Sequence, residues 1–264
     1  MEKNNNDKEG LQSEFVALFL SMLDYNNDKE FKKLLVKYKY NREELKDNIS
    51  KLYLKYLKDN KLKITYRDVV KEIKKLEGKL KRIGNDLKEQ ENLMLNLLLH
   101  KVFRDSYRKV NDILNMYVEQ SNINKVDEAV IDNFINTKID NKDVFNRNKD
   151  NKEKLINRVK NTIKNDLIVG KNIDVILKDI DKGFNSGVDK SDELISNEIA
   201  RVFNGALIEG YKNNKINKVM WNSQFEENTC SECREMDGRV FNIDEAPIIP
   251  LHNHCKCFYT AVLE

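Results

Sequence analysis

Cysteine and proline are nearly absent from this chain of 264 residues, which has four cysteines and two prolines. All of them lie within residues 221–264, together with two of the three histidines. No proline interrupts residues 10–213, so nothing enforces an early helix end there, and apolar residues recur mostly at helical spacing. These absences predict a mainly α protein in which a long helical region precedes a short C-terminal segment of different character.

The chain also lacks a large excess of charge of one sign, and it lacks long apolar runs. The 47 basic and 44 acidic residues leave a formal net charge of +3, which by itself does not indicate a nucleic-acid binder. The apolar run Phe15–Leu23 is far shorter than the roughly 20 residues of a membrane-spanning helix. It follows acidic residues and lacks a cleavage site, so it is typical of a core helix rather than an export signal. We expect a soluble, intracellular protein without a membrane partner.

One apolar series in the helical region alternates steps of three and four over about two to three heptads. So short a series favours a long helix that packs against neighbours in the same chain, and a coiled-coil arm that binds a partner or self-associates is the alternative. Acidic residues dilute the lysines around it, which predicts a solvated face rather than a DNA-binding one. The series consists of Ile73, Leu76, Leu80, Ile83 and Leu87.

The polar, asparagine-rich stretch 146–151 predicts a loop between two domains. We place the boundary there. Residues 1–150 would form a helical N-terminal region that acts as a docking or coiled-coil arm, and residues 151–264 a small α+β module.

The expected module begins with two amphipathic helices. The first opens at Asn172 as an N-cap and closes near Gly183 and Gly187, and the second ends near Gly210. A short strand at residues 218–221 then leads into a cysteine-rich knuckle, residues 221–264.

The knuckle contains a CxxC pair and an HxxCxC cluster, and both are typical of tetrahedral zinc sites. We favour Cys230, Cys233, His252 and Cys255 as ligands. A four-cysteine site that includes Cys257 is sterically possible, because Cys255 and Cys257 would point to one side of an extended strand. Thiols that hold no metal are the remaining alternative. A structural Zn²⁺ would contribute about 10 kcal/mol to the folding of this segment, which has few large apolar side chains. Six candidates compete for four positions: Cys230, Cys233, His252, His254, Cys255 and Cys257.

A catalytic role for this site is the minority interpretation. The thiolate-rich ligand set indicates a closed, structural metal site, and the zinc-deaminase signature is absent. The letters of His252-Asn253-His254 spell the name of a nuclease motif, yet only ten residues follow His254. We therefore expect no enzymatic activity, and a metal-dependent nuclease acting on packaged DNA is the alternative.

Four strings in order resemble the phage head morphogenesis family, the minor head proteins related to protein F of phage Mu. The resemblance spans about residues 154–262. The sequence departs from the family pattern at Asn253-His254, where the family usually has Pro-Asn, and at Lys256, where it usually has Arg. The strings are Glu198-Ile-Ala-Arg-Val-Phe-Asn204, Val219-Met-Trp221, Thr229–Cys233 with Met236–Phe241, and Pro250–Cys257.

This resemblance implies a minor capsid protein of a tailed phage or prophage that joins the procapsid. It implies a place at the portal vertex and a role in DNA delivery, with portal protein, other head or scaffold proteins and phage DNA as partners. The protein would lie in the host cytoplasm during assembly and then in the virion head. The resemblance also marks Glu198 and Asn204 as motif residues. Asp237-Gly238 predicts a turn that returns the chain as a strand, whether or not anything binds there.

Overall fold

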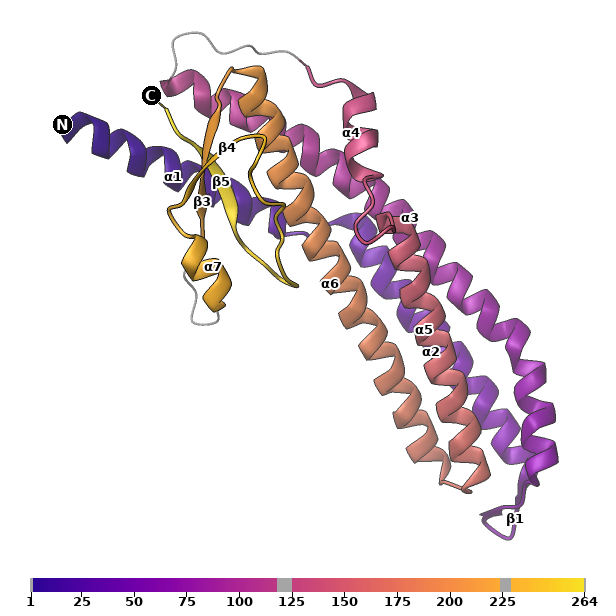
Figure 1. Cartoon of the computed structure of the whole chain (residues 1–264). Coiled ribbons are helices and arrows are strands. Elements are labelled where there is room, and N and C mark those ends of the chain that lie inside the picture. Colours follow the sequence, from indigo (N-terminus) through magenta and orange to yellow (C-terminus); the bar gives the residue numbers. More distant parts are fainter. Residues whose placement is uncertain (1, 118–124, 224–228, 264) are drawn as a thin grey trace. The chain divides into compact units, whose positions relative to one another are not determined.

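The computed structural model describes residues 2–117, 125–223 and 229–263. The fold is mainly α, as expected, with a small strand module near the C-terminus (Figure 1). The helices are α1 Glu2–Leu23, α2 Lys29–Tyr56, α3 Tyr66–Tyr117, α4 Glu128–Ile135, α5 Val144–Ile168, α6 Ile173–Asn213 and α7 Ser231–Met236. The strands are β1 Leu57–Lys58, β2 Lys61–Leu62, β3 Lys218–Asn222, β4 Val240–Asn242 and β5 Phe258–Ala261.

The chain divides into two compact units, each built from separate stretches of sequence. The bundle unit comprises Asn26–Leu95 and Phe145–Asp192. The sheet unit comprises Met1–Tyr25, Asn96–Val144 and Glu193–Glu264. The division between units therefore falls within α3 and α6.

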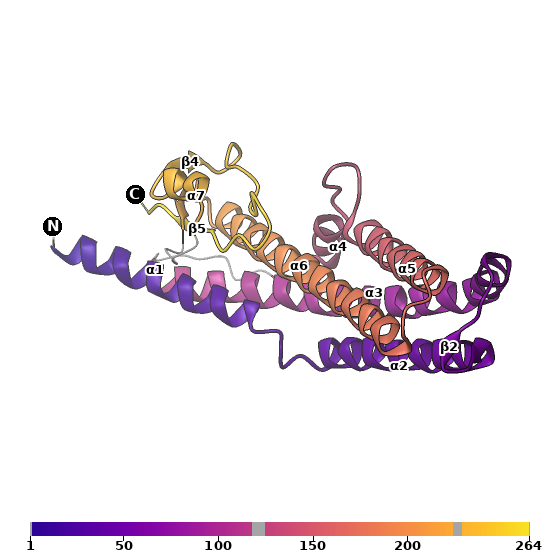
Figure 2. The same cartoon turned by 90° about the horizontal axis from the view of Figure 1, so that it is seen from below.

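The bundle unit consists of α2, the first part of α3, α5 and the first part of α6, which run side by side in both views (Figures 1 and 2). The apolar series that begins at Ile73 and ends at Leu87 is buried inside this unit, with each side chain less than a tenth exposed. Neighbouring helices of the same chain therefore cover the series. Around it, Lys46 on α2 pairs with Asp181 on α6 at 3.0 Å, and Lys79 on α3 donates to Asn48 on α2 at 2.5 Å.

The sheet unit contains a three-stranded antiparallel sheet in the order β4-β3-β5. The expected strand at 218–221 is thus present, and so is the strand that returns after Asp237-Gly238. Trp221 lies opposite Tyr259 on β5, and both are buried. Phe19 of α1 contacts Phe203 of α6 and Phe258 of β5, with ring centroids 4.7 and 5.8 Å apart. The run Phe15–Leu23 is therefore part of a core helix, and among the described residues no helix is long and apolar enough to cross a membrane.

Two expectations about helix ends are wrong. Residues 146–151 lie within α5 and form no loop. Buried Asn148 donates to Lys88 and Asn92 of α3, so this polar stretch is part of the bundle. A boundary at residue 150 would cut this helix, and the separate role assigned to residues 1–150 stays a prediction.

The second correction concerns α6, which is one continuous helix where two were expected. Asn172 does cap it, because its side chain accepts a hydrogen bond from the Asp174 amide at 3.0 Å. Gly183 and Gly187 do not end it. A Cβ atom at either position would lie 2.8 Å from a side chain of α5, Val159 or Leu155, so these glycines serve close helix packing.

Candidate metal centre

The CxxC pair is positioned by the short helix α7. Cys230 is its N-cap, with extended backbone, and its Sγ accepts a hydrogen bond from the Cys233 amide at 3.3 Å. One helical turn thus brings both thiols to the same side. Cys233 is buried and Cys230 is half-buried.

The second arm of the site is the segment that precedes β5. Its His252 places Nε2 3.1 Å from the Cys233 Sγ, and Cys255 places its Sγ 3.9 Å from the same atom. The other ring nitrogen of His252, Nδ1, lies 2.9 Å from the Asn253 carbonyl oxygen. In the neutral ring, a proton on Nδ1 that is donated to that carbonyl leaves the lone pair on Nε2, which faces the Cys233 sulfur.

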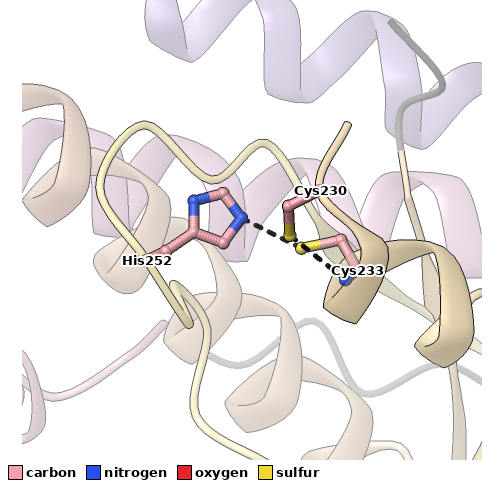
Figure 3. A group of neighbouring side chains, drawn as sticks. All are labelled: Cys230, Cys233 and His252. Carbon is pink, nitrogen blue, oxygen red and sulfur yellow. Dashed lines mark hydrogen bonds between the residues drawn. The ribbon is translucent and has the colours of Figure 1, made fainter. Parts of the chain in front are cut away.

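The ligand atoms form two groups that share Cys233. The first contains Cys230, Cys233 and His252 (Figure 3), and the second contains Cys233, Cys255 and Cys257. Within each group the ligand atoms lie within 4.8 Å of one another. A tetrahedral zinc site with Zn–S bonds of about 2.3 Å places its sulfur atoms about 3.8 Å apart. The donor set and its spacing therefore fit a metal ion.

Proton affinities within the site diverge. Hydrogen bonding by Cys257 lowers the pKa of Cys255 to about 5, while burial raises the pKa of Cys233 to about 12. A hydrogen bond from the Cys233 amide lowers the pKa of Cys230, and the neighbouring Cys255 raises the pKa of Cys257. A metal ion held by several of these sulfurs would displace protons from them.

Five of the six predicted ligand candidates are brought together, and His254 is not among them. His254 has a positive φ of 58°, and its backbone amide donates to the Asn197 side chain of α6 at 2.7 Å. Its position is explained by this anchoring of the loop to α6. Which four of the five gathered residues bind a metal stays a prediction.

Ser223, which the sequence did not single out, connects the site to the sheet. Its hydroxyl donates to the Cys233 carbonyl at 2.5 Å, and the Cys257 thiol lies 3.7 Å from that hydroxyl. Its backbone amide donates to the Asp237 carboxylate at 2.7 Å. Asp237 therefore joins α7 to the end of β3 and holds the cysteine-bearing turn in place.

Residues 157–260 match the family described as Phage Mu protein F like protein. The resemblance read from the sequence is thus confirmed, over less than half of the chain. No curated protein and no solved structure matches the chain.

The motif residues of this Phage Mu F-like region have structural roles in the sheet unit. Asn204 on α6 accepts a hydrogen bond from the Tyr259 amide at 3.0 Å and donates to the Cys257 carbonyl at 3.2 Å. It thereby fixes the start of β5 and the last cysteine. Gly238 has a φ of 71° and donates its amide to the Trp221 carbonyl at 2.9 Å, which makes the predicted turn.

Glu198 forms a buried ion pair with Arg201, a residue to which the sequence alone assigns no role. Their closest atoms lie 2.7 Å apart, and the two side chains are 1% and 3% exposed. Arg201 also donates to the backbone carbonyls of Phe134 and Ile135 at the end of α4, at 2.9 and 3.3 Å. The Glu198–Arg201 pair thus attaches α4 to α6.

Proposed function

We propose that this protein is a minor head protein that acts in procapsid assembly at the portal vertex and affects DNA delivery. The observation that carries the proposal is the family match at residues 157–260. That stretch contains the end of α5, all of α6, β3, β4, most of β5 and all four cysteines. Its partners would be the portal protein and other head or scaffold proteins, with phage DNA as a further candidate.

We propose that the cysteine knuckle holds one structural Zn²⁺ and displays a fixed surface to these partners. The support is the donor set: four cysteines and one histidine gathered by α7 and the segment before β5. No long apolar series stabilises residues 229–257 in the way that such series stabilise the bundle, and a metal would supply that stability. The ion would supply cross-linking, while Ser223 and Asn204 orient the protein backbone around it.

Metal content is the direct test of this part of the proposal. We expect about one zinc per chain in protein purified under reducing conditions without a chelator. Cys233→Ser should abolish the zinc, because Cys233 belongs to both ligand groups. His254→Ala is the matched control and should retain it. Zinc content measured separately in His252→Ala and in Cys257→Ser shows which of these two residues is the fourth ligand. A zinc content near zero in the unsubstituted protein would contradict the proposal.

Assembly is tested by co-expressing the full chain with the portal and major head proteins of the same phage. We expect it to sediment with procapsids and to copurify with the portal protein. The full chain is needed because a cut at residue 150 passes through α5 and divides the bundle unit. A folded chain, checked by circular dichroism, that stays unbound in the presence of assembled procapsids would contradict the proposal.

The alternative function, a metal-dependent nuclease, is tested in parallel with plasmid DNA and several divalent metals. Degradation that disappears in His254→Ala would favour it over a structural role. Absence of cleavage with every metal would remove it.

A further inference from the structure

A groove between α3 and α5 in the bundle unit is separate from the metal centre. It encloses a cavity of about 470 Å³, a size typical of small-molecule sites. Leu80 and Gly84 of α3 and Ile156 of α5 form its apolar floor. Gly84 lets Ile156 pack directly on α3, because a Cβ atom there would lie 2.9 Å from the Ile156 side chain.

The two helices are antiparallel along this groove and are fixed to each other at both ends. At one end, buried Asn148 donates to the Lys88 carbonyl at 3.1 Å and to the Asn92 side chain at 2.8 Å. At the other end, Lys160 pairs with Glu77 at 3.6 Å. These contacts fix the position of α5 relative to α3 along the groove.

Positive charge is enriched along the groove. Five lysines line it against two glutamates, although basic and acidic residues are nearly balanced over the chain. Lys160 is paired with Glu77, and Lys149 lies 3.9 Å from Glu153. Among the described residues, Lys81 and Lys88 make no ion pair. The five lysines are Lys81, Lys88, Lys149, Lys152 and Lys160.

Lys152 is a buried cation in the groove wall. Its side chain is 3% exposed and lies 2.6 Å from the Glu91 carboxylate and 2.9 Å from the Ser191 hydroxyl. Tyr38 completes this cluster, with its hydroxyl 3.0 Å from that of Ser191. Glu91 does not line the groove, but it pairs with Lys152 and is therefore added to the two lining glutamates. The five lysines then exceed the three glutamates by two positive charges. That excess suits a phosphate group, which carries up to two negative charges.

The two ends of the groove differ. Glu77 pairs with Lys160 at one end. At the end marked by Asn148, the described residues show no ion pair for Lys88, and Lys149 has one long contact of 3.9 Å with exposed Glu153. Asn85 and Asn157 lie between the ends and offer amide donors and acceptors above the apolar floor. A ligand that suits all three features has an anionic end, polar edges and a flat apolar face.

We propose that the α3–α5 groove binds a nucleoside phosphate, with the phosphate between Lys88 and Lys149 and the base or sugar over Leu80, Gly84 and Ile156. Free nucleotides and nucleotides within a DNA strand share this chemistry. The cavity volume restricts the bound part to about one or two nucleotides. The proposal does not depend on the head-assembly role, because its readout is binding to the purified chain.

The test is equilibrium titration of the full chain by calorimetry with ADP, with pyrophosphate and with a short oligothymidylate. We expect ADP to bind more tightly than pyrophosphate, because only ADP covers the apolar floor. Tighter binding of the oligothymidylate than of ADP identifies a DNA strand as the natural source, and the reverse order identifies a free nucleotide. Raising the salt concentration should weaken all of them.

Two double variants with the same change in net charge make the test specific. Lys88→Glu/Lys149→Glu should weaken ADP binding about tenfold or more, a loss of about 1.4 kcal/mol. Lys74→Glu/Lys154→Glu changes one exposed lysine on each of the same helices outside the groove and should change binding less than about twofold. Lys88→Gln/Lys149→Gln repeats the first test without added negative charge if charge reversal impairs folding. No binding of ADP or oligothymidylate at about 1 mM, equal weakening by both reversals, or pyrophosphate binding as tightly as ADP would overturn the proposal.

Discussion

Replacing Arg201 by methionine tests whether the buried Glu198–Arg201 pair attaches α4 to α6. The change keeps most of the side-chain volume and removes the guanidinium. Four hydrogen bonds would be lost: two to the Glu198 carboxylate, at 2.9 and 2.7 Å, and two to carbonyls at the end of α4. The Glu198 carboxylate would stay buried without its cation. Breaking a buried pair in this way costs about 3–5 kcal/mol of unfolding free energy.

The chain offers a matched control for that variant. Arg104 also binds α4, through two contacts of 2.7 and 2.6 Å to Glu128, but the two side chains are 48% and 58% exposed. An exposed pair contributes about 0.2–1 kcal/mol, so Arg104→Met should be nearly neutral.

Removing both members of the buried pair separates charge from packing. Glu198→Leu/Arg201→Met leaves no buried carboxylate and should lose only about 1–3 kcal/mol, mainly through the unpaired carbonyls of α4. The assay is urea unfolding followed by far-ultraviolet circular dichroism, with midpoints compared at equal m values. The reasoning is refuted if Arg201→Met is no less stable than Arg104→Met, or if the double variant is at least as unstable as Arg201→Met.

Three further predictions concern single positions. Gly205→Ala should lower the melting temperature, because its Cβ atom would lie 2.0 Å from the Phe134 ring. Gly78→Ala is the control: its Cβ atom meets open space, and the protein should gain about 0.5–1 kcal/mol of stability from helix propensity. Equal changes in melting temperature for the two variants would contradict this prediction. Asn204→Leu should speed hydrogen exchange at the Tyr259 amide, since that amide loses its acceptor, and unchanged protection would count against the assigned contact. Hydrogen bonding by Lys55 lowers the pKa of Glu72 from 4.5 to about 2, so the stability this group adds is present above pH 4.5 and lost as the pH falls toward 2. Glu72→Gln should flatten the acid limb of a stability–pH curve, and an unchanged limb would contradict that assignment.

Periodicity was enough to predict much of the helical fold. The series from Ile73 to Leu87 and the run Phe15–Leu23 contribute buried side chains to helices, as their spacing indicates. Glycine and asparagine misled the prediction of helix ends, because their local preference for turns is weaker than packing between helices. Gly183 and Gly187 allow α5 to approach α6, a purpose that only the folded structure reveals.

The metal ligands could be predicted only in part from the sequence. Spacing identifies the cysteines and histidines but not which of them converge. The His252 ring meets Cys233 with one nitrogen and the Asn253 carbonyl with the other. Asn197 binds the His254 backbone amide, and His254 lies outside both ligand groups. The contacts of Arg201 with α4 could not be predicted from the sequence, because its partners Phe134 and Ile135 lie more than sixty residues away along the chain.

The cysteine knuckle depends on α6 as much as on its own ligands. Asn197 holds the loop at Asn253 and His254, and Asn204 holds the chain at Cys257 and Tyr259. These two asparagines are seven residues apart, so they lie on one face of the helix and contact the second ligand arm at both of its ends. A metal could cross-link Cys230 and Cys233 to that arm, but α6 already sets where the arm lies. The position of the ligand segment is therefore specified by the helix against which it folds, and this helix lies within the matched residues 157–260.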